Sequence, residues 1–123
     1  MEPCALSTVR QQDPAPAEGG WEVVDVEAVV DGLGAVDVAY KELMQVPSFS
    51  AGVYRLAAGS RDMQGPHDDD EVYYVLSGRA RVRVGEEVRE VRPGSLLYVR
   101  ASTDHAFFEI EEDITLLVLF TNG

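Results

Sequence analysis

Between residues 36 and 121 the chain is a series of short segments with strand-like sequence, separated by glycine, proline and other turn residues. The segment at residues 79–84 shows the pattern most clearly, because arginines alternate strictly with Ala80, Val82 and Val84. A period of two predicts a strand that has one face in the core and its charges in water. Roughly eight or nine short strands at close intervals indicate an all-β domain of the sandwich or barrel type.

The N-terminal part of the chain has a different character. Residues 1–20 are polar and end in a stretch rich in proline and glycine, so we expect a flexible arm there. Residues 21–24 are a candidate edge strand, and residues 25–33 are a candidate short helix with Asp25 as its N-cap. Residues 21–123 then form one domain. The strands expected after the helix cover residues 36–45, 49–56, 71–76, 79–84, 88–91, 95–100, 105–110 and 114–121.

The composition limits the partners and the compartment. The 123 residues suffice for one domain with one core, and 22 acidic against 10 basic residues give a formal net charge of -12. Such a charge repels phosphate backbones and anionic lipids, which argues against nucleic acid or a membrane as a partner. No apolar run reaches the ~20 residues of a spanning helix, and no signal peptide is recognisable. The single cysteine, Cys4, fits a reducing compartment, so we expect a cytoplasmic protein.

The chain has only two histidines, and both stand at the start of a strand-like segment. His67 lies in a loop four residues before Glu71, which opens one segment, and His105 opens another. Two imidazoles and a carboxylate at strand ends are the parts of a mononuclear metal site. A buried Glu71 that only hydrogen-bonds His67, without a metal ion, is the alternative.

At this point the sequence resembles the cupin superfamily. The first cupin motif is Gly, five residues, His-x-His, three or four residues, Glu, six residues, Gly. Gly59, His67, Glu71 and Gly78 stand at these spacings, and Gly65 occupies the place of the first histidine. The first motif is therefore matched except for one ligand.

The second cupin motif is matched less fully. It is Gly, five residues, Pro-x-Gly, two residues, His, three residues, Asn. Gly94 and His105 match, whereas Arg100, Ser102 and Glu109 replace the proline, the second glycine and the asparagine. With both motifs included, the resemblance covers about residues 48–121 and implies a jelly-roll β-barrel.

The resemblance also implies a metal site. A full cupin site has three histidines and one glutamate, whereas this chain supplies only His67, Glu71 and His105. Such a set suits Fe(II) in oxygenase chemistry, and Zn, Mn and Ni accept similar ligands, so we expect one divalent metal ion. Gln64, beside the missing histidine, is a candidate fourth ligand through its amide oxygen. Glu71 is the candidate catalytic residue, as a ligand or as a base.

Five further residues are candidates for a substrate pocket. Tyr73 and Phe107 share a strand face with Glu71 and His105 respectively, and Met63 and Tyr98 are further candidates. Each of the four is also an ordinary choice for a barrel core. Arg100 is placed either to bind a substrate carboxylate in a bidentate manner or to pair with a surface acid.

Glu109 and the aspartates at residues 68–70 each have a structural and a functional interpretation. Glu109 is either a second carboxylate near the site or, as we favour, a residue that reaches solvent or pairs with an arginine. Residues 68–70, three consecutive aspartates, are expected to form a solvated loop; at the rim of the pocket they would instead repel anionic substrates and favour neutral or cationic ones.

Two classes of function follow. The first is an enzyme that acts on a small organic molecule, such as a dioxygenase or a metal-dependent isomerase or lyase. The second is a non-catalytic barrel that binds a small molecule or a metal ion. The resemblance to small cupins also implies a homodimer, in which residues 21–24 add to the edge of a partner's sheet.

Overall fold

The structure is a computed structural model that describes residues 20–34, 38–60, 62 and 68–121. Of the residues expected at the site, Met63, Gln64 and His67 lie outside the described residues. The flexible arm expected at residues 1–20 also lies outside them, apart from Gly20.

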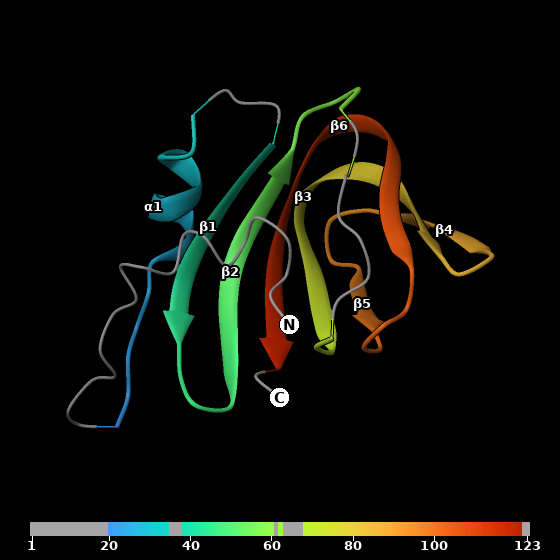
Figure 1. Ribbon diagram of the computed structural model, residues 1–123. Helices are drawn as coiled ribbons and strands as arrows, with labels where there is room; N and C mark the ends of the chain where they lie inside the picture. Colours follow the sequence, from blue (N-terminus) through green and yellow to red (C-terminus); the bar gives the residue numbers. More distant parts are fainter. Residues whose placement is uncertain (1–19, 35–37, 61, 63–67, 122–123) are drawn as a thin grey trace.

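The described residues form one antiparallel sheet and one short helix (Figure 1). The strands follow the order β1-β2-β6-β3-β4, and β5 pairs with β3 beside this path. The elements are α1 (Val26–Asp31), β1 (Val38–Gln45), β2 (Phe49–Leu56), β3 (Glu71–Val84), β4 (Glu87–Val91), β5 (Leu96–Val99) and β6 (His105–Thr121). The expected all-β class is confirmed, and the arrangement is consistent with a jelly roll.

The two longest strands correct the sequence-based segmentation. We expected Ser77 and Gly78 to end a strand, but β3 continues through them, and β6 likewise joins the two segments expected at its ends. Gly78 has φ +92° and Glu109 has φ +47°, and the pairing of β3 with β6 shifts register three times between Val75 and Arg81. Bulges of this kind bend a strand without ending it.

The N-terminal elements are partly as expected. Asp25 caps α1, because its side chain accepts a hydrogen bond from the Ala28 amide at 3.2 Å. The edge strand expected at residues 21–24 is wrong, since this stretch has no strand pairing, and Trp21 and Val23 are 69% and 78% exposed. At six residues α1 is too short to cross a bilayer, and the described part of the chain contains no helix that could.

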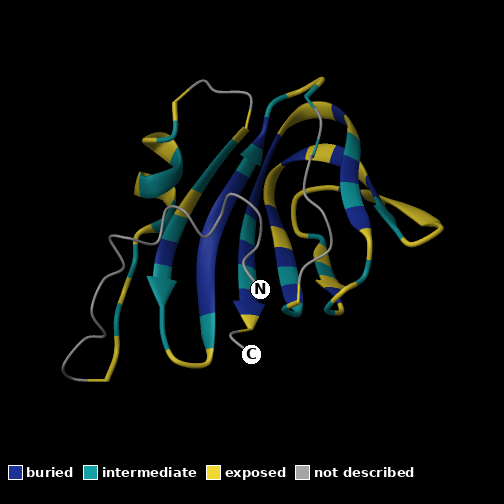
Figure 2. Cartoon of the chain, in the orientation of Figure 1, coloured by how far each residue is buried: buried dark blue, intermediate teal, exposed yellow. Residues whose placement is uncertain are grey.

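The core lies on the concave side of the curled sheet, where alternate residues of β2, β3 and β6 meet (Figure 2). Along β3, Glu71, Tyr73 and Val75 are buried while Tyr74 and Leu76 are exposed, as the period-two pattern predicts. The buried apolar cluster comprises Tyr54, Leu56, Tyr73, Val75, Ala80, Val82, Val91, Val99, Phe107, Ile110, Ile114, Leu116, Val118 and Phe120.

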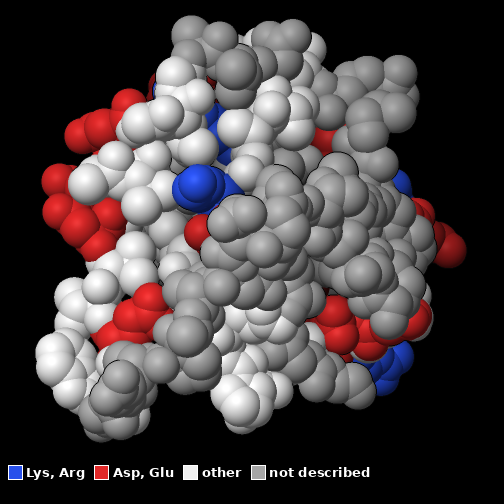
Figure 3. Space-filling view, turned by 60° about the vertical axis from the view of Figure 1, so that its left-hand side comes forward, with Lys and Arg blue, Asp and Glu red and all other residues white. Residues whose placement is uncertain are grey.

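The surface charge is acidic in several separate places. On the face seen in Figure 3, groups of acidic side chains lie around the periphery with few basic ones among them. The distribution agrees with the formal net charge of -12.

Candidate functional site

The candidate site lies where the first residues of β3 and β6, the two longest strands, contact each other. Glu71 opens β3, and His105 opens β6, where it pairs with Val84 at the other end of β3. The two residues therefore meet only because the β3–β6 pair curls over and brings its ends together. The bends at Gly78 and Glu109 lie between these ends.

The side chains of Glu71 and His105 are in direct contact inside the core. The Oε1 atom of Glu71 lies 3.0 Å from Nε2 of His105, and both side chains are 1% exposed. A carboxylate and an imidazole are costly to bury unless each has a partner, so the pair is a defined site and not an accident of packing.

The hydrogen bonds of His105 fix its orientation. Its Nδ1 atom lies 2.9 Å from the carbonyl oxygen of Thr103, and because a carbonyl only accepts, Nδ1 carries a hydrogen. The neutral form then has its lone pair on Nε2, the atom that faces Glu71. A backbone carbonyl in this position is the usual outer partner of a metal-binding histidine.

Tyr73 completes the polar contact around Nε2. Its hydroxyl lies 3.2 Å from Nε2 of His105, and its ring packs edge-on against Phe107 with the centroids 5.2 Å apart. Tyr73 and Phe107 are each 1% exposed. The structure thus places both residues beside the polar pair, where the strand alternation predicts them.

The surroundings shift the proton affinity of His105. Burial alone lowers its pKa, but four effects together outweigh it and leave the pKa above the ordinary value of 6.5. They are the hydrogen bond with Glu71, the hydrogen bond with Thr103, and the negative charges of Glu71 and Asp62. In the absence of a metal ion the structure therefore favours a proton on Nε2, shared with Glu71.

Asp62 is a residue of the site that the sequence did not reveal. Its Oδ1 atom accepts a hydrogen bond from the Tyr54 hydroxyl, and its Oδ2 atom accepts one from the Phe107 amide, each at 3.0 Å. It thereby ties the loop after β2 to two strands of the barrel, close to His105. No signal distinguishes it in the sequence, because it falls in the unspecified spacer between Gly59 and His67.

Two of the expected pocket residues are exposed, and Tyr98 lies on the opposite face of the sheet from the Glu71–His105 pair. Tyr98 is 57% exposed and stands opposite Val72 on the outer face of the sheet, whereas Glu71 and Tyr73 are on the inner face. Arg100 is exposed just after β5, and within the described residues it makes no ion pair with an acid. Residues 96–99 are apolar at both parities, so sequence alone does not say which parity faces inward.

The acidic residues near the strand ends largely have structural roles. Glu109 is exposed and lies 3.3 Å from Arg81, so the favoured interpretation, a surface pair with an arginine, is confirmed. In the aspartate loop Asp70 is half-buried and accepts a hydrogen bond from the Ala101 amide at 2.7 Å. The loop is therefore less solvated than expected, because one of its carboxylates holds the chain after β5.

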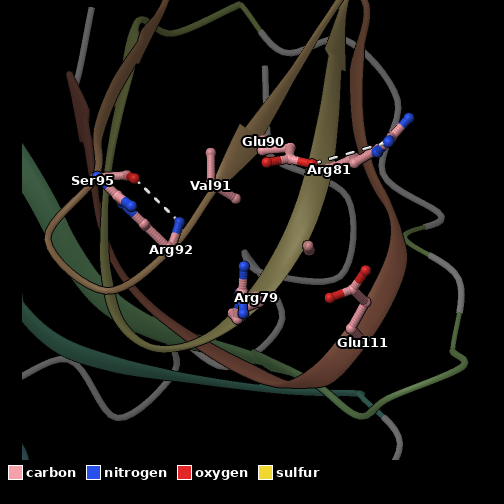
Figure 4. A pocket seen from close by; sticks show the side chains of 8 residues that line it. Arg79, Arg81, Glu90, Val91, Arg92, Ser95 and Glu111 are labelled. Atoms are coloured by element: carbon pink, nitrogen blue, oxygen red, sulfur yellow. Dashed lines mark hydrogen bonds and ion pairs between the residues drawn. The ribbon is translucent and has the colours of Figure 1, made fainter.

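A separate pocket of about 380 Å³ lies beside β3 and β4 (Figure 4). Its charged lining residues are Arg79, Arg81, Arg92, Glu90 and Glu111. Arg81 is 3.8 Å from Glu90, whereas Arg79 and Arg92 make no ion pair within the described residues. No residue of this pocket belongs to the pair of Glu71 and His105.

The separation of Glu71 and His105, the two expected ligands that the structure describes, fits a shared metal ion. Two ligands at about 2.1 Å from an ion and at a right angle are roughly 3 Å apart, which matches the observed separation. The described part of the chain holds no group of three or more His, Cys, Asp or Glu side chains that could bind a metal ion. His67, the third ligand expected from the sequence, lies outside the described residues.

Comparison of the chain with known protein families agrees with the two sequence motifs. The chain matches the family described as Cupin domain over residues 52–121, more than half of its length, and it belongs to the cupin family. The resemblance stated from the sequence is therefore confirmed.

Three similar proteins illustrate the relationship. The uncharacterized protein SCO3923 of Streptomyces coelicolor is 46% identical over 71% of this chain and 83% of its own length. The structure of TT1209 from Thermus thermophilus has a TM-score of 0.72 and 27% identity, over 82% of this chain and 97% of that one. The DMSP lyase DddQ of Ruegeria pomeroyi has a TM-score of 0.65 and 21% identity, over 75% of this chain and 53% of that one. At this identity the likeness to DddQ shows the fold alone.

Proposed function

We propose that this cupin binds one divalent metal ion inside its barrel and uses it to act on a small organic molecule. Glu71 and His105 are two of the ligands, and His67 is the third, with Gln64 as a weaker fourth. Fe, Zn, Mn and Ni all accept this set of donors. The single cysteine fits a reducing compartment, so we propose that the protein is cytoplasmic.

One observation carries the proposal. A carboxylate oxygen of Glu71 and an imidazole nitrogen of His105 lie 3.0 Å apart, with each side chain 1% exposed, beside the buried apolar cluster. A buried pair of this kind costs free energy that apolar residues of the same size would not cost. A binding function explains why the chain retains it.

The chain's own residues indicate what chemistry the site supports. A bound divalent ion would supply Lewis-acid chemistry by polarising a substrate oxygen. The hydroxyl oxygen of Tyr73 lies 3.2 Å from Nε2 of His105, so it is placed to donate or accept a proton in the site. Phe107 packs against Tyr73 and excludes water from that side. Isomerase or lyase chemistry and dioxygenase chemistry are both compatible with this arrangement, and the fold neighbour DddQ is a lyase.

Metal binding is the first test. The protein is stripped with a chelator, titrated separately with Fe(II), Zn(II), Mn(II) and Ni(II), and its metal content is determined by elemental analysis. We expect one ion per chain in the wild type. We expect affinity for that ion to fall by at least about 100-fold in His105→Ala, Glu71→Ala and His67→Ala, because each loses a ligand outright.

The control is Glu112→Gln, which neutralises an exposed carboxylate on the same strand as His105. It should bind the ion as the wild type does. Circular dichroism establishes that each variant is folded. If the wild type holds no more metal than His105→Ala, the proposed site does not exist.

A non-catalytic barrel that binds a small molecule is the second candidate. The observation in its favour is Gly65 at the position of the first motif histidine, which leaves one ligand fewer than a full cupin site. Fragment screening of the metal-loaded protein separates the two: turnover of a bound compound, abolished by Tyr73→Phe, supports the enzyme, whereas tight binding without turnover supports the binder.

A further inference from the structure

We propose that the pocket beside β3 and β4 binds a small organic acid through its carboxylate or phosphate oxygens. The pocket is a second binding site, and it shares no residue with the Glu71–His105 pair. Its volume of about 380 Å³ lies near the lower end of the range for ligand pockets, so it fits a compact molecule. Ala80 and Val91, which stand opposite each other in the β3–β4 pairing, supply an apolar part of the lining that can contact the carbon skeleton.

Two arginines of this pocket have no acidic partner among the described residues. Seven arginines lie in the part of the chain that the structure describes, and four of them form ion pairs with acids: Arg55, Arg81, Arg83 and Arg89. Of the remaining three, Arg79 and Arg92 line this one pocket. A guanidinium group is always charged, and its planar fork matches a carboxylate or a phosphate. Two such groups around one cavity are therefore suited to an anionic ligand.

Arg79 is surrounded by acids and yet pairs with none of those described. It stands opposite Glu112 in the pairing of β3 with β6, and Glu90 and Glu111 line the same pocket. Glu90 is already engaged by Arg81 at 3.8 Å. In the view of Figure 4, Arg79 lies between the turn after β4 on one side and Glu111 on the other. The guanidinium of Arg79 is thus available to a ligand in the pocket.

Hydrogen bonds hold the turn that carries Arg92. The Arg92 amide donates to Oγ of Ser95 at 3.0 Å, and the Ser95 amide donates to the Arg92 carbonyl at 2.9 Å. The Gly94 amide donates to the Val75 carbonyl at 2.9 Å, which ties the turn to β3. Because the Ser95 hydroxyl accepts a hydrogen bond from Arg92, its own hydrogen is left to donate to a ligand. A turn that is already ordered loses less entropy when a ligand binds.

The charges of the lining determine the class of ligand. Since Arg81 is neutralised by Glu90, the charges left to a ligand are those of Arg79, Arg92 and Glu111. Two positive charges and one negative charge leave the pocket positive, so it favours an anion, and Glu111 opposes that anion. The whole chain has a formal net charge of -12, so long-range attraction does not bring an anion to it. Binding has to come from the contacts with the two arginines.

Titration of the ¹⁵N-labelled full chain, followed by NMR, tests the proposal. The probes are inorganic phosphate and malonate, which carry the two kinds of acidic oxygen, and NaCl at equal ionic strength is the blank. We expect saturable shifts of the amide signals of residues 92–95 with at least one probe and none with NaCl. Affinity should fall at least about 10-fold in Arg79→Gln and in Arg92→Gln, because each loses hydrogen bonds between charged groups. Both arginines are exposed, so neither substitution should disturb the folded chain.

The matched control is Arg89→Gln, which removes the same charge from an exposed residue of β4 outside the pocket. It should bind the probe as the wild type does. Glu111→Gln changes the affinity in the opposite direction: it removes the opposing charge and should tighten binding about two- to five-fold. His105→Ala should bind the probe unchanged, which separates this pocket from the proposed metal site whether or not that site holds an ion.

The comparison of the two probes shows whether phosphate or carboxylate is the preferred group. Absence of a saturable shift with both probes overturns the proposal. Equal affinities in Arg79→Gln and Arg89→Gln, or weaker binding in Glu111→Gln, also overturn it, because the charges of this pocket would then not control binding. A loss of binding in His105→Ala overturns it as well, since the probe would then occupy the barrel interior.

Discussion

The Nε2 atom of His105 can hold a proton or a metal ion, but not both. In the metal-free protein its pKa lies above 6.5, because Glu71, Thr103 and Asp62 together outweigh the opposite effect of burial. The folded chain therefore binds this proton more tightly than the unfolded chain does. The resulting stability is fully present below pH 6.5 and is lost as the pH rises through the folded-state pKa.

Metal binding has the opposite dependence on pH, because only the neutral imidazole is a ligand. We expect the rise in melting temperature caused by a saturating metal ion to be small at about pH 6 and to grow as the pH passes the pKa of His105. Thermal unfolding of the metal-free and metal-loaded protein at a series of pH values measures this difference. In His105→Ala the difference should be close to zero throughout. A metal effect that grows toward acid pH would contradict the site.

The hydroxyl of Tyr73 makes a second prediction at this scale. Tyr73→Phe keeps the ring packed against Phe107 but removes the hydrogen bond to His105, which is 3.2 Å long and fully buried. The free energy of unfolding should fall by about 1 kcal/mol, measured by urea denaturation. Tyr98→Phe removes the same atom from a ring that is 57% exposed and should have almost no effect. Equal losses in the two variants would show that the buried hydroxyl contributes nothing specific.

Part of the site was predictable from the sequence, because motif spacing and strand alternation each assign a position to a single residue. Glu71, Tyr73 and Phe107 were placed correctly, since a period of two puts every second residue on one face. The rule did not help with Tyr98, because a short strand that is apolar at both parities does not reveal its inner face. Asp62 was missed, because its role depends on backbone and hydroxyl groups from β2 and β6 that only the folded chain brings to it.

At the scale of elements, Gly78 permits the bend that closes the barrel. It has φ +92°, and a Cβ atom there would collide with the backbone of Asp113 and Ile114 on β6. Gly78→Ala should therefore lower the free energy of unfolding by at least about 3 kcal/mol, from backbone strain and overpacking together. Urea denaturation followed by circular dichroism measures the change.

The control for Gly78→Ala separates the steric collision from the backbone strain. Gly94 has nearly the same backbone angle, φ +94°, but a Cβ atom there would meet nothing within 4 Å. Gly94→Ala should lose only the strain, about 1–2 kcal/mol. If the two alanine variants are equally stable, close approach of β6 is not the reason for a glycine at residue 78.

The same bend explains why the number of strands was overestimated. Ser77 and Gly78 have the composition of a turn, as do the acidic residues 111–113 in the middle of β6. Local sequence correctly marked both places as irregular. Whether an irregular residue ends a strand or only bulges it depends on the partner strand, and the pairing of β3 with β6 continues on both sides of Gly78.

For the whole molecule, the family and the barrel were predictable because many weak local signals agree, from alternation and turn residues to two motifs. The exposure of Tyr74, Leu76 and Leu96 was not predictable, because the sequence shows only that these residues are apolar. Apolar residues at both parities of a strand are as compatible with a fully buried strand as with a strand that is exposed on one face. Only the order of the strands shows that, among the described residues, this face of β3 and β5 has nothing over it.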